Sequence, residues 1–267
     1  MGPRKKPLVV FVHGVDGSAA EAAIGFGAVL DPARFRLFTY DLLGRGEDLG
    51  ADRKDHSIDA YVAQLRRVTS KLPAAATAPF FLVGFSMGAA IAAVFAMRYP
   101  ERVRKLCLIC PAGRSVPASY LALGSYMLPF QLWKATVVPM AIERVRQSFE
   151  GTTRGSKSTR SSSSSQAIRR RIDQVLRRKT ELYQDDRFLR VAHETVKQFP
   201  FSAVPLSPVR VPALVIAAKS DRAVPTENAR RFAADIGARV KVVSGTHAVI
   251  YTRPDAVREA VEAFFAL

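Results

Sequence analysis

The feature that most constrains the fold is a serine with a glycine two residues to either side, in Gly84-Phe85-Ser86-Met87-Gly88. A serine whose Oγ stands clear of a sharp strand-to-helix turn strains its own backbone, and side chains two positions before and after it would collide with neighbouring backbone. Glycine at both positions removes that collision. The pattern therefore predicts a sharp turn that presents Ser86, provided that a strand precedes it and a helix follows.

The flanking residues supply both elements. Residues 79–83 form a continuous aromatic and aliphatic run, as in a buried parallel strand. Residues 87–99 are rich in alanine and end at Pro100, which favours a helix. A glycine-rich turn of this kind can also bind phosphate, but no lysine follows as a phosphate loop requires. The context favours a catalytic serine.

Short apolar runs alternate with helical patterns along most of the chain, which is typical of an α/β protein with a mostly parallel sheet covered by helices on both faces. Apolar residues at helical spacing predict helices at 58–72, behind the capping Ser57, and at 254–266. The expected strands are 7–12, 35–40, 79–83, 105–109, 211–217 and 239–243.

One long segment, 112–208, interrupts this alternation and contains no convincing strand. We expect residues 1–111 and 209–267 to form the core and residues 112–208 to form an inserted helical cap. Within the cap, 120–142 is strongly apolar, but its prolines and a lysine interrupt it too often for a transmembrane helix. Residues 151–165 are rich in serine and arginine and almost lack apolar side chains, which predicts a flexible loop.

The chain is strongly basic, with 40 Lys and Arg against 23 Asp and Glu and a formal charge of +17. The cap segment alone contains 16 Lys and Arg and 7 Asp and Glu. Such an excess indicates an anionic partner surface or a merely solvated basic face. Aromatic residues are not interleaved with the basic ones, so we expect no nucleic-acid binding. The basic residues of one predicted cap helix are Arg169, Arg170, Arg171, Arg177, Arg178 and Lys179.

The two cysteines, Cys107 and Cys110, have CxxC spacing but lie in an apolar run with no second pair or nearby histidine. We interpret them as buried strand thiols rather than metal ligands, and we expect neither a metal nor a cofactor. The apolar run at 9–12 is too short for the hydrophobic region of a secretory signal. We expect a cytoplasmic location, with peripheral membrane contact left open.

A serine hydroxyl is a poor nucleophile until a base takes its proton. His247 follows the last predicted strand, where parallel sheets gather site residues, and is the best positioned base. His13 follows the first strand, and we interpret it as a hydrogen-bonded structural residue of that loop. His56 lies in a charged stretch and His193 in a cap helix, and we interpret both as solvated surface residues.

The base needs a carboxylate that holds its imidazole in the correct tautomer. Asp221 follows a predicted strand, and the order Ser86, Asp221, His247 places the acid between serine and histidine. An ion pair of Asp221 with a neighbouring basic residue is the alternative. Asp41 precedes the serine, and we expect its carboxylate to fix a turn through backbone hydrogen bonds.

In this order and context, these residues resemble the α/β-hydrolase family. Residues 13–18 resemble the His-Gly oxyanion loop of that family, and residues 41–46 resemble its Asp-x-x-Gly-x-Gly turn. Ser86, Asp221 and His247 resemble its catalytic triad. The resemblance covers nearly the whole chain outside the cap.

The resemblance implies that the backbone N–H groups of Val15 and Met87 form an oxyanion hole. Two departures stand out. Ala89 occupies a position where many relatives have a second glycine, which a helix start tolerates. The family usually opens with a β-hairpin that is missing here, so strand 35–40 would lose a neighbour. An exposed edge of this kind invites pairing between two copies or covering by a loop, or indicates an incomplete gene model.

Together, the residues and the resemblance predict a serine hydrolase that cleaves a small-molecule carboxylic ester through an acyl-enzyme. The apolar half of the cap predicts a lipid-like acyl group, with Met127, Phe130 and Trp133 as substrate contacts. The basic cap suggests an ester presented at an anionic membrane, as in lipases of the monoacylglycerol or lysophospholipid type. Carbon–carbon bond hydrolysis with the same triad and a non-catalytic binding protein remain as alternatives.

Overall fold

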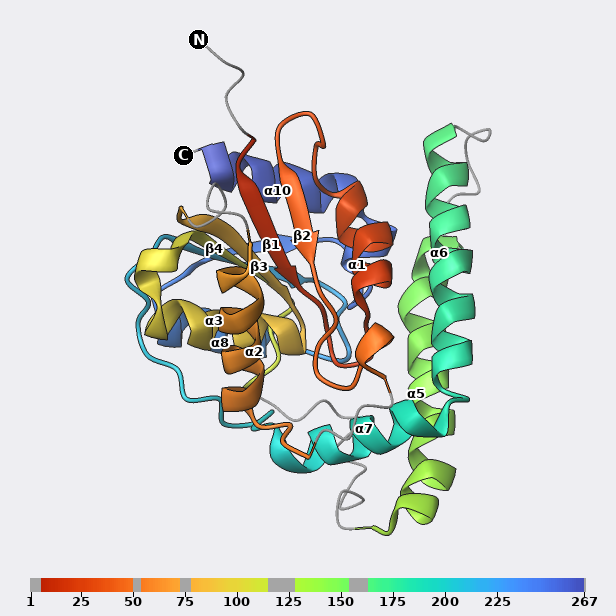
Figure 1. Ribbon diagram of the computed structural model, residues 1–267. Helices are drawn as coiled ribbons and strands as arrows, with labels where there is room; N and C mark the ends of the chain where they lie inside the picture. The colour runs from red at the N-terminus through yellow and green to blue at the C-terminus, as the bar shows by residue number, and fades with distance from the viewer. Residues whose placement is uncertain (1–5, 50–53, 73–77, 115–127, 154–162, 267) are drawn as a thin grey trace.

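A single six-stranded parallel sheet in the order β2-β1-β3-β4-β5-β6 forms the centre of the protein (Figure 1). The computed structural model describes residues 6–49, 54–72, 78–114, 128–153 and 163–266. The strands are β1 (Leu8–Val12), β2 (Arg36–Thr39), β3 (Phe80–Phe85), β4 (Val103–Ile109), β5 (Ala213–Ala218) and β6 (Arg239–Val243).

Helices cover both faces of this sheet (Figure 1). Alternate residues of β1 pack into two different clusters because successive side chains of a strand point to opposite faces. Val10 and Val12 pack in the cluster that includes α2, α3 and α8, whereas Val9 and Phe11 pack in the cluster that includes α1 and α10. The core helices are α1 (Ala19–Gly25), α2 (Ile58–Ser70), α3 (Met87–Arg98), α8 (Thr226–Ile236), α9 (Val249–Thr252) and α10 (Pro254–Ala266), with short 3-10 turns at Phe26–Ala28, Gly46–Asp48 and Pro100–Arg102.

The predicted strands and helices agree with the structure to within about two residues at most ends. Every residue of β3 and β5 is buried, which explains why both read as unbroken apolar runs. Strand β2 lies at one edge of the sheet and, among the described residues, pairs with β1 alone. The expected edge at this strand is therefore present in the fold.

The described part of the segment predicted as a cap contains the helices α5 (Phe130–Thr153), α6 (Ser163–Leu182) and α7 (Asp186–Gln198). Figure 1 shows α5 and α6 side by side next to α1, with α7 running from the lower end of α6 beneath the core. Helix α5 continues through Pro139. No helix of the described ranges has both the length and the apolar composition needed to cross a bilayer.

The structure corrects the loop expected at 151–165. Helix α5 includes the first three of these residues and α6 begins at Ser163, so both ends of the segment are helical. A composition rich in serine and arginine occurs at helix ends as well as in loops, so composition alone does not distinguish the two. Residues 154–162 lie outside the described part of the chain.

Candidate active site

Ser86 occupies the sharp turn between β3 and α3, with φ 55° and ψ −119°. A non-glycine residue at positive φ is strained, and such strain collects at functional sites. A Cβ at Gly88 would lie 2.2 Å from the carbonyl oxygen of Val12, and one at Gly84 would lie 2.4 Å from that of Gly88. The two glycines thus permit the close backbone approach that the sequence pattern predicted.

Ser86, His247 and Asp221 form a continuous hydrogen-bonded chain. The Ser86 Oγ lies 3.1 Å from His247 Nε2, and His247 Nδ1 lies 2.8 Å from Asp221 Oδ2. The other carboxylate oxygen, Asp221 Oδ1, accepts hydrogen bonds of 2.8 Å from the backbone N–H groups of Ala223 and Val224. The three side chains come from the ends of three different strands, as the sequence order predicted, and the ion pair of Asp221 is with His247 rather than with a basic neighbour.

The environment of His247 favours its protonated form. Burial lowers the pKa of His247, but the charge of Asp221 and its hydrogen bond outweigh burial, so the pKa lies above its ordinary value. An imidazole stabilised in this way holds a proton taken from a hydroxyl next to it. This is the electrostatic arrangement that a general base beside Ser86 requires.

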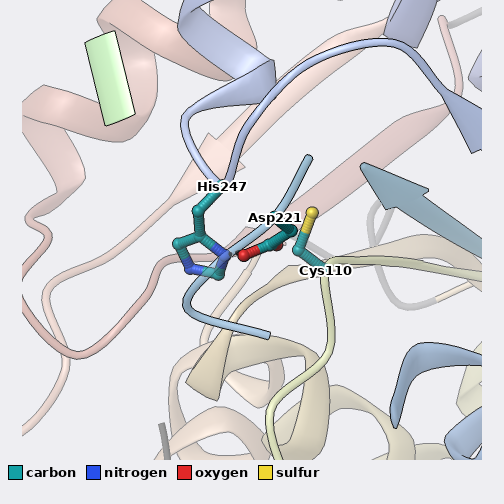
Figure 2. Close-up of side chains that lie close together, drawn as sticks. All are labelled: Cys110, Asp221 and His247. Atoms are coloured by element: carbon teal, nitrogen blue, oxygen red, sulfur yellow. Dashed lines mark hydrogen bonds and ion pairs between the residues drawn. The ribbon is translucent and has the colours of Figure 1, made fainter. Parts of the chain in front are cut away.

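Cys110 lies beside Asp221, on the side away from His247, as Figure 2 shows. Burial raises the pKa of this thiol well above its ordinary value, so the sulfur stays neutral. Cys110, Asp221 and His247 place one ligand atom each within 4.8 Å of one another, as a metal site does. The imidazole and the carboxylate of this cluster are already bonded to each other, at 2.8 Å, in the chain that leads to Ser86. We therefore interpret Asp221 and His247 as members of the hydrogen-bonded chain to Ser86, and Cys110 as a buried neighbour of Asp221.

The predicted strand position of the cysteines holds for Cys107 alone, which is buried in β4. Cys110 is equally buried and free, but it follows the strand, with φ 48°. The backbone turns sharply here, which ends the β4 ladder after Ile109. Nothing in the apolar run indicated that this thiol lies beside the Asp221 carboxylate.

His13 fixes the loop that follows β1. Its Nε2 accepts a 3.0 Å hydrogen bond from the N–H of Leu42, so its Nδ1 carries the proton and donates to the carbonyl of Gly14 at 2.8 Å. Burial lowers the pKa of His13 to about 4, so the ring is neutral. The N–H of Gly17 also donates to the Gly14 carbonyl, at 3.2 Å. His13 is thus the structural, hydrogen-bonded residue that we predicted.

The anchored Gly14 carbonyl sets the direction of the next N–H group. In a trans peptide the carbonyl of Gly14 and the N–H of Val15 lie in one plane and point in opposite directions. The Val15 carbonyl in turn accepts a 2.8 Å hydrogen bond from the buried Arg45 Nε. Gly14 packs against Ser86, since a Cβ added at Gly14 would lie 3.3 Å from the Ser86 Cβ. The loop is rigidly held beside the serine.

Asp41 fixes a turn, as predicted. Its Oδ1 accepts a 2.6 Å hydrogen bond from the N–H of Ala19, and its Oδ2 accepts one of 3.1 Å from the N–H of Glu47. Gly46 has φ 54° and a Cβ there would lie 2.1 Å from the Asp41 carboxylate, so the turn needs glycine. This carboxylate is saturated by backbone and does not approach His247.

Two histidines were wrongly expected at the surface. His56 is completely buried, and its Nδ1 lies 2.9 Å from the hydroxyl oxygen of Tyr61. His193 is 4% exposed and packs its ring 5.0 Å from that of Trp133. Charged neighbours in the sequence suggested solvent, but both rings lie on the inward sides of their segments.

A cavity of about 140 Å³ opens beside Ser86 and His247. Its wall is mostly apolar and combines the core with the cap, including Trp133, Val137, Phe149, Phe188 and Val224. Of the residues predicted to contact substrate, Trp133 lines this cavity. Phe130 lines a separate surface hollow beside Arg190 and His193 instead, and Met127 lies outside the described residues.

Lys179 lies at the site, although the sequence placed it only among the basic residues of a cap helix. It is 6% exposed and lines the cavity. Its ammonium lies 3.0 Å from Asp16 and 3.0 Å from Glu21. Helical spacing could have predicted the burial of Lys179. It follows Ile172 by seven residues and Val175 by four, so it lies on the same buried face of the helix.

Comparison with known proteins decides the family. A family model described as serine aminopeptidase, S33, matches residues 3–248. The chain belongs to this α/β-hydrolase family. The family assignment agrees with the parallel sheet, the helices on both of its faces and the sharp turn at Ser86.

The relatives of this hydrolase differ in what they act on. Monoacylglycerol lipase ABHD6 of Homo sapiens is 34% identical over 112 residues, which is 42% of this chain and 32% of the lipase. The 2-hydroxy-6-oxononadienedioate/2-hydroxy-6-oxononatrienedioate hydrolase of Burkholderia vietnamiensis is 30% identical over 146 residues, which is 55% of this chain and 47% of that enzyme. The hydrolase thus spans less than half the length of these two curated relatives.

Solved structures share the fold of the hydrolase across almost its whole length. An enol-lactonase of Burkholderia xenovorans has a TM-score of 0.73 at 21% identity, covering 100% of this chain and 94% of its own. A thermophilic esterase of Thermogutta terrifontis has a TM-score of 0.72 at 20% identity, covering 98% of this chain and 90% of its own. At such identities the likeness shows the fold alone.

Proposed function

We propose that this hydrolase cleaves carboxylic esters through an acyl-enzyme formed at Ser86. One observation carries the proposal: the hydrogen-bonded chain from Asp221 through His247 to the strained Ser86 ends at an apolar cavity. The lipase, lactonase and esterase among the similar proteins support ester chemistry.

In this mechanism His247 accepts a proton and then donates it in each half of the reaction. As the Ser86 Oγ attacks the ester carbonyl carbon, His247 Nε2 takes the hydroxyl proton and then passes it to the departing alkoxide, which leaves as the alcohol. A water then attacks the acyl-enzyme, gives its proton to the same Nε2, and releases the acid as the proton returns to Ser86. Asp221 holds Nδ1 protonated and stabilises the imidazolium in both halves.

The oxyanion of each tetrahedral intermediate needs donors that are already oriented. We assign them to the N–H groups of Val15 and Met87. The hydrogen bond of His13 to the Gly14 carbonyl orients the Val15 N–H, which supports Val15 as one donor. Met87 is the first residue of the 12-residue helix α3, so the helix dipole strengthens its N–H as the second donor. Losing one such donor typically costs about 2.7–4 kcal/mol of barrier.

The acyl group should be apolar, because the described cavity wall is dominated by aromatic and aliphatic side chains such as Trp133, Phe149 and Phe188. We propose a lipid-like acyl chain in this cavity. The test is hydrolysis of a p-nitrophenyl ester series of increasing chain length by wild type and Ser86→Ala. We expect activity with the medium and longer chains that is lost in Ser86→Ala, whereas hydrolysis that survives Ser86→Ala would sink the proposal.

Carbon–carbon bond hydrolysis is a second function that one observation favours. Arg144 lines the cavity and makes no ion pair or hydrogen bond within the described part of the chain. A free guanidinium suits the carboxylate of a diketone-like acid, and one relative is a hydrolase of 2-hydroxy-6-oxo acids. Turnover of such an acid at a higher kcat/KM than any ester would make this the main activity.

We further propose that the cap contacts an anionic membrane from a cytoplasmic location. The exposed side chains of the cap include Arg169, Arg170 and Arg178 of α6 and Leu132 of α5. Cations attract anionic headgroups, and exposed apolar side chains gain from partial insertion. No strand of the described residues pairs with the outer edge of β2, which supports a homodimer joined through this strand. Analytical ultracentrifugation of wild type and Leu37→Pro tests this proposal.

A further inference from the structure

Lys179 places a buried cation from the cap directly on the loop that carries Val15. The residue belongs to α6, and its side chain is 8% exposed. Burying an ammonium costs several kcal/mol unless it is paired and hydrogen-bonded, which makes its partners informative.

The three hydrogens of this ammonium have three acceptors. Its Nζ donates to the backbone carbonyl of Asp16 at 2.5 Å and lies 3.0 Å from Asp16 Oδ1 and 3.0 Å from Glu21 Oε1. Burial lowers the pKa of Lys179, but the two carboxylates outweigh burial and keep the pKa above its ordinary value. The ammonium is therefore charged and saturated, so it holds the loop rather than binding an anionic substrate.

Two tyrosine hydroxyls donate hydrogen bonds to the carboxylates of Asp16 and Glu21. The hydroxyl of Tyr183, one residue beyond α6, donates to Asp16 Oδ2 at 3.2 Å. The hydroxyl of Tyr251 in α9 donates to Glu21 Oε1 at 2.6 Å. The cluster of Lys179, Asp16, Glu21, Tyr183 and Tyr251 thus joins the cap to the loop, to α1 and to the helix that follows His247.

With this contact, three successive carbonyls of the loop are anchored. Gly14 is held by His13, Val15 by Arg45, and Asp16 by Lys179. The first two anchors belong to the core, whereas the third comes from the inserted cap. The planes of the peptides on both sides of Val15 are therefore fixed, and the plane after Asp16 depends on α6 being docked.

We infer that Lys179 is a positioning residue that couples docking of the cap to the shape of the oxyanion hole. The inference rests on the proposed function, because it gives the Val15 N–H its role. A cap helix that lifts from the core withdraws its cation and frees the Asp16 end of the loop. The Gly14 and Val15 carbonyls keep their core anchors, so we expect the Val15 N–H to be less accurately oriented when the cap is undocked.

The experiment compares Lys179→Met with Lys134→Met on one neutral p-nitrophenyl ester. Lys134 is a matched control, because it is another cap lysine and its ion pair with Asp186 joins α5 to α7 without touching the loop. We expect Lys179→Met to lower kcat about 10- to 100-fold with a small change in KM, since a displacement near 1 Å costs about that much. Lys134→Met should stay near wild type. Equal kcat values in the two variants would overturn the inference.

A pH profile separates positioning from general loosening. Several groups face the His247 imidazole or line its cavity: Asp221 after β5, Asp16 in the loop, Lys179 in α6, Arg144 in α5 and Tyr251 in α9. Asp16 raises the pKa of His247 and Lys179 lowers it. The acid limb of kcat/KM should therefore move to higher pH in Lys179→Met and to lower pH in Asp16→Asn, although kcat falls in both. If the acid limbs of Lys179→Met and Asp16→Asn move in the same direction, the inference is contradicted.

Folding is checked by circular dichroism and thermal melting of each variant. If Lys179→Met does not fold, Asp16→Asn and the charge-retaining Lys179→Arg carry the test. We expect reduced kcat in Asp16→Asn and an intermediate kcat in Lys179→Arg, and wild-type kcat in Asp16→Asn overturns the inference. Hydrolysis that survives Ser86→Ala refutes the proposed function instead, so the two failures are distinguishable.

Discussion

The turn at Ser86 predicts a large effect from the smallest change in side chain, Gly88→Ala. The added Cβ would lie 2.2 Å from the Val12 carbonyl oxygen and 2.4 Å from that of His13, whereas real Cβ atoms come no closer than 3.0 Å. Both atoms are backbone, so α3 must move from the end of β1 by at least about 0.8 Å. A shift near 1 Å costs about 100-fold in rate, and overpacking costs about 1–3 kcal/mol of stability.

The assay measures kcat/KM on a p-nitrophenyl ester and the thermal midpoint for Gly88→Ala and for Gly27→Ala. Gly27 is the matched control, because a Cβ there meets nothing closer than Leu37 at 3.8 Å and its φ is not positive. We expect Gly88→Ala to lose about two orders of magnitude in kcat/KM and to melt lower, and Gly27→Ala to match wild type or melt slightly higher. A Gly88→Ala variant with wild-type activity would refute the steric account of the turn.

Three further predictions concern charge and access. Asp221 raises the pKa of His247, so Asp221→Asn should move the acid limb of kcat/KM to lower pH. It should also reduce kcat by about 10⁴-fold. An acid limb that does not shift would contradict the role of Asp221 as the partner of His247. Burial raises the pKa of both Cys107 and Cys110, so iodoacetamide should label neither in native protein and both after denaturation, as mass spectrometry would show; rapid native labelling would place a thiol at the surface. The hydrolase should sediment with anionic but not neutral vesicles and should be released by salt, and equal recovery with both vesicle types would remove the proposed membrane contact.

Local rules explain why much of the site was predictable from the sequence. The glycines around Ser86 report a close backbone approach that only glycine permits, so their spacing, together with the apolar run before it and the alanine-rich run after it, predicts the turn. Unbroken apolar runs identify β3 and β5 because these strands are buried on both faces. Asp221 and His247 then follow from their places after strands, since the carboxyl ends of parallel strands meet at one edge of the sheet.

Tertiary packing explains what was missed. His56 and His193 have charged neighbours in the sequence, yet both are buried. The ring of His193 packs against Trp133 of α5, and the backbone N–H of His56 donates to Gln198 of α7, 142 residues later. Lys179 reads as one cation among many, and its burial depends on two carboxylates more than 150 residues earlier in the chain. Such partners become visible only when distant segments are brought together.

The central claim is that Ser86 is the nucleophile, and covalent labelling tests it most directly. A fluorophosphonate probe is incubated with the folded protein, followed by intact-mass measurement and peptide mapping. We expect one adduct per chain, on the peptide that contains Ser86, and no adduct on a folded Ser86→Ala variant. Labelling at another residue, labelling that persists in Ser86→Ala, or no labelling of protein that hydrolyses esters would contradict the account.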